Sequence, residues 1–171
     1  MRRSLGAAAI VAGAIVALQS QSTADPKLQG QLKQLFPSAP SFSPKAPDPP
    51  HYKAFGPDGP SAPFTGLAFW TTEIEPLERG YDGPIKILVG MDTKGVLTGI
   101  IVVQHHEPYG DFSIETPQFA AQFKGKSVRD PFRVGYDIDA VSRATITITS
   151  AARAIRNSAR RMATRLLVPP K

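Results

Sequence analysis

The chain has 171 residues, 42% of them hydrophobic, which is enough for one domain with a modest core. It contains no cysteine, so disulfides, iron–sulfur clusters, c-type haem attachment and thiol nucleophiles are excluded. Any redox role therefore needs a cofactor held by other chemistry. The formal charge is +6, and arginines concentrated near the C-terminus raise nucleic acid as a partner to consider.

The first 24 residues have the pattern of a secretory signal peptide. Two arginines precede an uncharged apolar stretch at 5–18, and Ser22 and Ala24 place small residues just before a cleavage site. The apolar stretch is shorter than the roughly 20 residues that span a bilayer, so an uncleaved membrane anchor is the lesser alternative. We therefore expect a periplasmic protein that is soluble after cleavage and carries a formal charge of +4, because the two leader arginines are removed. Export argues against nucleic acid as a partner.

Residues 25–63 are interpreted as an arm that precedes the main domain. Leu28, Leu32 and Leu35 stand at helical spacing, which predicts a short amphipathic helix between 27 and 36. More than half of the 17 prolines then fall between 37 and 63. Such a segment is poorly suited to a sheet, and we expect an extended tether or a wrapping arm there.

The folded domain is expected over residues 64–168. We predict an α+β fold, with an antiparallel sheet and flanking helices, because β-type runs are followed by helical patterns. Its predicted elements are strands at 67–74, 85–91 and 96–104, a hairpin connection at 92–95, a short helix at 117–123, a loop at 130–136 and a basic helix from Ala151 to about Leu167.

The stretch from Asp139 to Ser150 carries the strongest functional signal. It reads as an acidic residue, small and hydroxylated residues, and then an alternating apolar and hydroxyl run before the basic helix. One interpretation is a hydroxyl and free backbone N–H groups at the mouth of a helix, where a phosphate is held most easily. The other is an ordinary half-buried strand over 144–150. The residues alone leave both open.

Residues 139–145 resemble the flavinylation motif D-x-x-S/T-G-A-T of the covalent FMN-binding domain family. Asp139, Ser142, Ala144 and Thr145 match, and Arg143 replaces the usual glycine. Similar segments run from about 80 to 166, and they look like those of the NosR-type members of the family. The resemblance implies FMN joined to Thr145 through a phosphoester, made by a flavin transferase that uses FAD as the FMN donor.

The resemblance also assigns the neighbouring residues. Asp139 and Ser142 would shape the loop and its recognition by the transferase. Glycine often marks a backbone position that other residues avoid, so Arg143 bears on the loop geometry and on whether flavinylation is retained, while its guanidinium offers a planar fork for a phosphate. Ala144, which also matches the motif, is the last of its candidate cofactor-binding residues.

His105 and Glu107 are further candidates for the cofactor site. In the family the corresponding loop lies near the flavin ring, which makes His105, Glu107 and Tyr109 flavin-proximal by resemblance. An exposed strand end is the alternative interpretation. Because neighbouring strand residues point to opposite faces, only His105 and Glu107 could share a metal ion, and two ligands fall short of the usual three or four. We predict no metal site.

The C-terminal basic helix is expected to present a solvated face. A docking face for an acidic partner or for anionic lipid headgroups, with peripheral membrane association, is the alternative. The resemblance implies an exported FMN-binding electron-transfer protein that relays electrons between redox partner proteins, closer to a redox carrier than to a stand-alone enzyme. A flavin-dependent periplasmic reductase and a cofactor-free accessory or assembly protein of a respiratory complex are the alternative functions.

Overall fold

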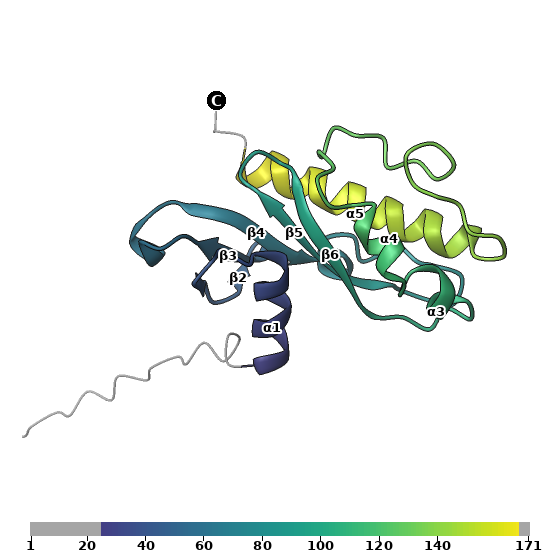
Figure 1. The fold of residues 1–171 in the computed structure, drawn as a ribbon, viewed down its shortest axis with the longest axis horizontal. Helices are drawn as coiled ribbons and strands as arrows, with labels where there is room; N and C mark the ends of the chain where they lie inside the picture. Colours follow the sequence, from purple (N-terminus) through teal and green to yellow (C-terminus); the bar gives the residue numbers. More distant parts are fainter. Residues whose placement is uncertain (1–24, 168–171) are drawn as a thin grey trace, which may run out of the picture.

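The computed structural model describes residues 25–167 (Figure 1). The predicted signal peptide lies outside the described residues. Within 25–167, no helix combines the length and the apolar character needed to cross a membrane.

Six strands form one antiparallel sheet, with the order β1-β3-β4-β5-β6 and with β2 paired to β3. The helices flank this sheet, which confirms the predicted α+β class (Figure 1). The strands are β1 (Ser41–Phe42), β2 (Ala46–Pro47), β3 (Pro50–Phe55), β4 (Phe64–Trp70), β5 (Lys86–Asp92) and β6 (Leu97–Gln104). The helices are α1 (Pro26–Leu35), the 3₁₀ turn η1 (Gly59–Ser61), α2 (Thr71–Ile74), α3 (Gly110–Ser113), α4 (Pro117–Ala121) and α5 (Thr145–Leu166).

The central strands are buried on both faces, because each face carries its own helix. Successive side chains of a strand alternate between the two faces, so Leu67 and Phe69 of β4 enter the core beneath α5. Their neighbours Ala68 and Trp70 enter a second core with the leucines of α1. α1 and α5 therefore cover opposite faces of the sheet (Figure 1).

The proline-dense segment contributes to the sheet, and the expectation that it was poorly suited to one was wrong. β3 pairs with β4 from Tyr52↔Ala68 to Phe55↔Phe64, and β1 and β2 pair with β3. Proline is tolerated here because Pro50 is the first residue of its strand, where a missing N–H does least harm. The segment thus wraps onto the domain instead of extending away from it.

The alternating run before the basic helix is helical, so the strand interpretation of 144–150 was wrong. α5 begins at Thr145, six residues before the predicted start at Ala151. Ile148, Ala152 and Ile155 are buried at helical spacing against the sheet. The predicted strand at 67–74 likewise ends at Trp70, and its last residues form α2.

Candidate cofactor site

Thr145 is the first residue of α5, and its side chain is exposed. The preceding residue, Ala144, is buried and makes no side-chain cap to the first N–H groups of the helix. A 22-residue helix carries a partial positive charge at this end. The structure therefore presents a hydroxyl beside uncapped donors, as the helix-mouth interpretation predicts.

The loop before Thr145 is shaped by a turn in which Arg143 adopts φ +70°. The N–H of Ala144 donates to the carbonyl of Val141 at 3.1 Å, and Ser142 and Arg143 form the exposed turn. A left-handed residue at this point explains why the related motif carries glycine there. Arg143 therefore keeps the loop geometry at a conformational cost, and its side chain faces the cavity described next.

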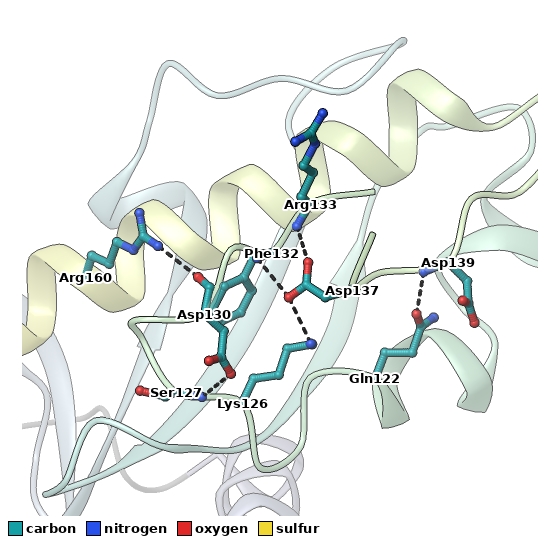
Figure 2. A network of polar contacts seen from close by, with 9 residues as sticks. All are labelled: Gln122, Lys126, Ser127, Asp130, Phe132, Arg133, Asp137, Asp139 and Arg160. Carbon is teal, nitrogen blue, oxygen red and sulfur yellow. Dashed lines mark hydrogen bonds and ion pairs between the residues drawn. The ribbon is translucent and has the colours of Figure 1, made fainter. Parts of the chain in front are cut away.

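Asp139 lies at the start of this loop and does not cap α5. Its backbone N–H donates to Oε1 of Gln122 at 2.6 Å, which ties the loop to the residue after α4 (Figure 2). The carboxylate of Asp139 is exposed. Asp139 and Ser142 thus lie on the accessible side of the loop, near Thr145 in sequence.

A cavity of about 550 Å³ opens beside Thr145. This volume lies in the range of small-molecule and cofactor sites. Two tyrosines stand in its wall, and the ring of Tyr109 packs against Phe112 at 5.4 Å between centroids. The lining residues are Tyr81, Pro108, Tyr109, Arg143, Thr145, Ile146 and Thr147.

A second, smaller cavity of about 260 Å³ lies on another side of Thr145. It is lined by Arg79 and Arg153 together with Thr149 and Ser150 of α5. Thr145 and Ile146 belong to both cavities. The hydroxyl therefore stands between an aromatic, mostly apolar space and a basic one.

Glu107 anchors the wall of the larger cavity without lining it. Its buried carboxylate accepts hydrogen bonds from the backbone N–H groups of Tyr81 and Asp82, both at 2.9 Å, and from the hydroxyl of Thr147. Burial favours the neutral acid, but these three hydrogen bonds outweigh it and hold the pKa of Glu107 below its ordinary value. Glu107 thus joins the 81–82 turn to the first turn of α5 as an ionised group.

The imidazole of His105 contacts the backbone of Glu107. Its Nδ1 accepts from the N–H of Glu107 at 3.0 Å, so the proton of the neutral ring lies on Nε2, which faces Oε1 of Glu115 at 2.7 Å. Gly110 lies so close that a Cβ there would collide with the imidazole. Both side chains are thus occupied by protein contacts, and Tyr109 alone of the three flavin-proximal candidates lines the cavity.

No cluster of three or more possible metal ligands occurs in residues 25–167. Sequence reasoning missed the part played by Thr147. Glu107 lies 40 residues before Thr147 in the chain, and no local pattern signals that pairing.

The arginines of α5 are mostly exposed, as expected of a solvated face, and several of them also bind other elements of the protein. Arg153 makes a two-pronged contact with Glu78 at 2.8 and 2.7 Å, and Arg161 contacts Glu75 at 2.9 Å. Arg160 donates to the carbonyls of Val128 and Asp130, both at 2.8 Å, and Figure 2 shows the contact with Asp130. These contacts fasten the segment after α2 and the 126–130 loop onto α5.

Comparison with known proteins finds matches over the part of the chain that contains this site. Residues 80–160 match the family model of the FMN-binding domain. The chain is 33% identical over 89 residues to the G subunit of the ion-translocating oxidoreductase complex of Vibrio vulnificus (strain YJ016), an overlap of 46% of this chain and 42% of that protein. It is 32% identical over 91 residues to the protein of the same name from Pseudomonas aeruginosa (strain UCBPP-PA14), covering 47% and 42%. The chain therefore spans less than half the length of these relatives.

The residues around Thr145 fit the cofactor that this family is named for. The larger cavity offers aromatic and aliphatic walls to a flat ring system, and the uncapped helix end with Arg143 offers donors to a phosphate. Tyr81, Tyr109 and Arg143 would line the ring and phosphate positions. Residues 80–160 thus match the FMN-binding domain family in sequence, and the residues around Thr145 agree with that match.

Proposed function

We propose that the protein is an exported electron-transfer protein that carries FMN as a phosphoester on Thr145. The observation that supports this most is the exposed Thr145 hydroxyl at the uncapped N-terminus of α5, between an aromatic cavity and a basic one. The matching motif residues Asp139, Ser142 and Ala144 lie in the turn that presents it. The cofactor supplies reversible one- and two-electron chemistry when bound.

Attachment requires a separate flavin transferase. The Thr145 oxygen would bond to the phosphorus of the FMN half of FAD, the bond between the two phosphates would break, and AMP would leave. The hydroxyl proton needs a base, yet among residues 25–167 no His, Asp or Glu lines either of the two cavities at Thr145. The transferase therefore has to supply that base. The helix end and Arg143 would hold the phosphate once it is attached.

The redox partners are proposed from the relatives, which are named as subunits of ion-translocating oxidoreductase complexes. We infer that this chain passes electrons between protein partners of a membrane-associated respiratory complex, on the periplasmic side. Tyr81 and Ile146 at the cavity are 69% and 58% exposed, so a ring held there would stay open to a partner. An open site suits a relay better than an enzyme that must exclude water.

The test is the intact mass of the exported protein from cells that co-express a flavin transferase. We expect one added FMN ester in the wild type and in Thr164→Ala, which removes another exposed threonine of the same helix. Thr145→Ala should show the unmodified mass. An unmodified wild type, with the transferase shown to be active on a second substrate protein, would reject covalent attachment. That result would favour the cofactor-free accessory protein.

A further inference from the structure

A basic groove of about 450 Å³ runs along α5 beyond the site at Thr145. Arg153 and Arg156 of α5 line it together with Arg133 of the preceding loop, and Thr149 lines it as well. Phe132 and Val134 form part of an apolar wall. Two separate elements thus bring three guanidinium groups to one hollow of ligand size.

The charges in this groove are only partly compensated. Arg153 uses Nε and Nη2 on Glu78, which leaves Nη1 outside that contact. Arg156 donates through Nε to the amide oxygen of Asn157 at 3.1 Å. Arg133 bonds to Asp137 only through its backbone N–H (Figure 2).

The nearby carboxylates of the loop are already engaged. Asp137 binds Lys126 and two backbone N–H groups, and Asp130 binds the N–H of Ser127 (Figure 2). α5 itself has no acidic residue. Among the residues that the structure describes, neither Arg133 nor Arg156 has a carboxylate partner, so the groove carries a positive charge that an anion would balance.

The groove is continuous with the site at Thr145. Thr149 and Arg153 line both this groove and the smaller cavity that Thr145 also lines. Residues four apart lie on one face of a helix, and each such step advances about 6 Å along its axis. Thr145, Thr149 and Arg153 therefore form one track from the proposed attachment point into the groove.

We propose that this groove binds the phosphate group of a small anion. Arginine forks match the paired oxygens of a phosphate, and three of them with a hydroxyl suit its double negative charge. The phosphate could come from inorganic phosphate or from a 5′-mononucleotide. The second source rests on the proposed function, since transfer of FMN from FAD to Thr145 would release AMP beside the groove.

The test is a titration of the full exported chain, labelled with ¹⁵N, with inorganic phosphate, AMP and adenosine. We expect saturable shifts of the Thr149, Arg153 and Arg156 amides with phosphate and with AMP. Arg133→Gln and Arg156→Gln should each weaken binding about tenfold, because each removes a charged hydrogen-bond donor. Arg129→Gln, an exposed arginine in another cavity, should leave the affinity unchanged.

The outcomes separate the two sources of phosphate. Equal affinities for phosphate and AMP would identify a site for the phosphate group alone, and AMP binding about tenfold tighter would identify a nucleotide site. No saturable shift, equal binding of adenosine, or unchanged affinity in both arginine variants would overturn the proposal. Because Thr145→Ala lies outside the groove, it should still bind the anion, so failure of flavinylation and failure of this site are distinguishable.

Discussion

Two carboxylates hold the two irregular regions of this domain, and they do so in different ways. Glu107 binds two consecutive backbone N–H groups, those of Tyr81 and Asp82, together with a neutral hydroxyl. Asp137 also binds two consecutive N–H groups, those of Phe132 and Arg133, but its third donor is the ammonium of Lys126 at 3.0 Å (Figure 2). The first group stabilises the wall of the candidate site, and the second stabilises the loop along α5.

The difference concerns how a buried negative charge is compensated. Glu107 is 6% exposed and is held mainly by three neutral hydrogen-bond donors, so each lost donor leaves a buried ionised group less well compensated. Asp137 lies near the surface beside a cation and within reach of solvent screening. The site wall should therefore depend on precise geometry, whereas the loop should respond to salt.

The largest expected effect is that of Glu107→Gln. An amide replaces one acceptor oxygen with a donor, so at least one of the three donors around Glu107 faces another donor. We expect a loss of about 3 kcal/mol in the free energy of unfolding, measured with urea. Glu115→Gln, at a side chain that is 54% exposed, should change it by less than about 0.5 kcal/mol. Equal effects of the two variants would contradict the role given to Glu107.

Asp137→Asn should lower the free energy of unfolding by less, about 1.5 kcal/mol. The environment of Asp137 is less buried, so water can replace part of the lost contact. The wild-type contribution of Asp137 should also fall in 1 M NaCl, which screens its attraction to Lys126. We therefore expect the difference between wild type and Asp137→Asn to shrink in salt, while that for Glu107→Gln stays constant. Urea unfolding at low and high salt measures both, and the reverse pattern would refute the comparison.

Acid should unfold the protein through the same two groups. Burial alone would raise both pKa values, but the hydrogen bonds on Glu107, and those on Asp137 together with Lys126, lower them below their ordinary values of 4.5 and 3.8. A lowered pKa in the folded state means that the unfolded chain binds protons first. The stabilisation is thus fully present above the ordinary values and is lost as the pH falls through the folded-state values.

The matching measurement is the free energy of unfolding between pH 6 and pH 2. We expect a plateau above about pH 5 and a fall below it, since the ordinary carboxyl values lie near 4. Glu107→Gln and Asp137→Asn should each flatten part of this fall, because each removes one titrating group. A fall that is unchanged in the double variant would assign acid sensitivity to other carboxylates.

The sequence located the loop before α5 but not the contacts around it. The motif resemblance located Thr145 and its loop, and the regular strands 85–91 and 96–104 followed from β-type composition. The start of α5 was misplaced because Ile and Thr favour strands, whereas burial of Ile148 and the bond of Thr147 to Glu107 favour the helix here. Tertiary contacts therefore determined the secondary structure of residues 145–150, whose local propensities for helix and strand were mixed.

The contacts of Glu107 and the strand β3 could not be found in the sequence for a different reason. The donors to Glu107 lie 25, 26 and 40 residues away, and no short-range spacing encodes them. In β3, proline at the first position hid a strand whose Tyr52 and Ala54 enter the core beneath α1. Both the contacts of Glu107 and the pairing of β3 depend on contacts between segments that are far apart in the sequence or that carry no local signal.

Arg143→Gly is the smallest change that we expect to measure, and its sign is opposite to the others. Arg143 has φ +70°, and Phe132, with φ 52°, is the other non-glycine residue with positive φ in residues 25–167. The ring of Phe132 is buried against Phe123, which offsets its backbone cost, so Phe132→Gly should lose about 3 kcal/mol. Arg143 is exposed and has no such packing.

Glycine at 143 should therefore raise the free energy of unfolding by about 0.5 to 1 kcal/mol, because the left-handed conformation costs glycine little. The yield of FMN ester on Thr145 should be at least that of the wild type, since the turn is kept. Urea unfolding and intact mass on the same preparations check both points. A destabilised Arg143→Gly variant with a lower ester yield would show instead that the guanidinium itself stabilises this turn, and Arg143 would then be a functional replacement for glycine that binds the phosphate.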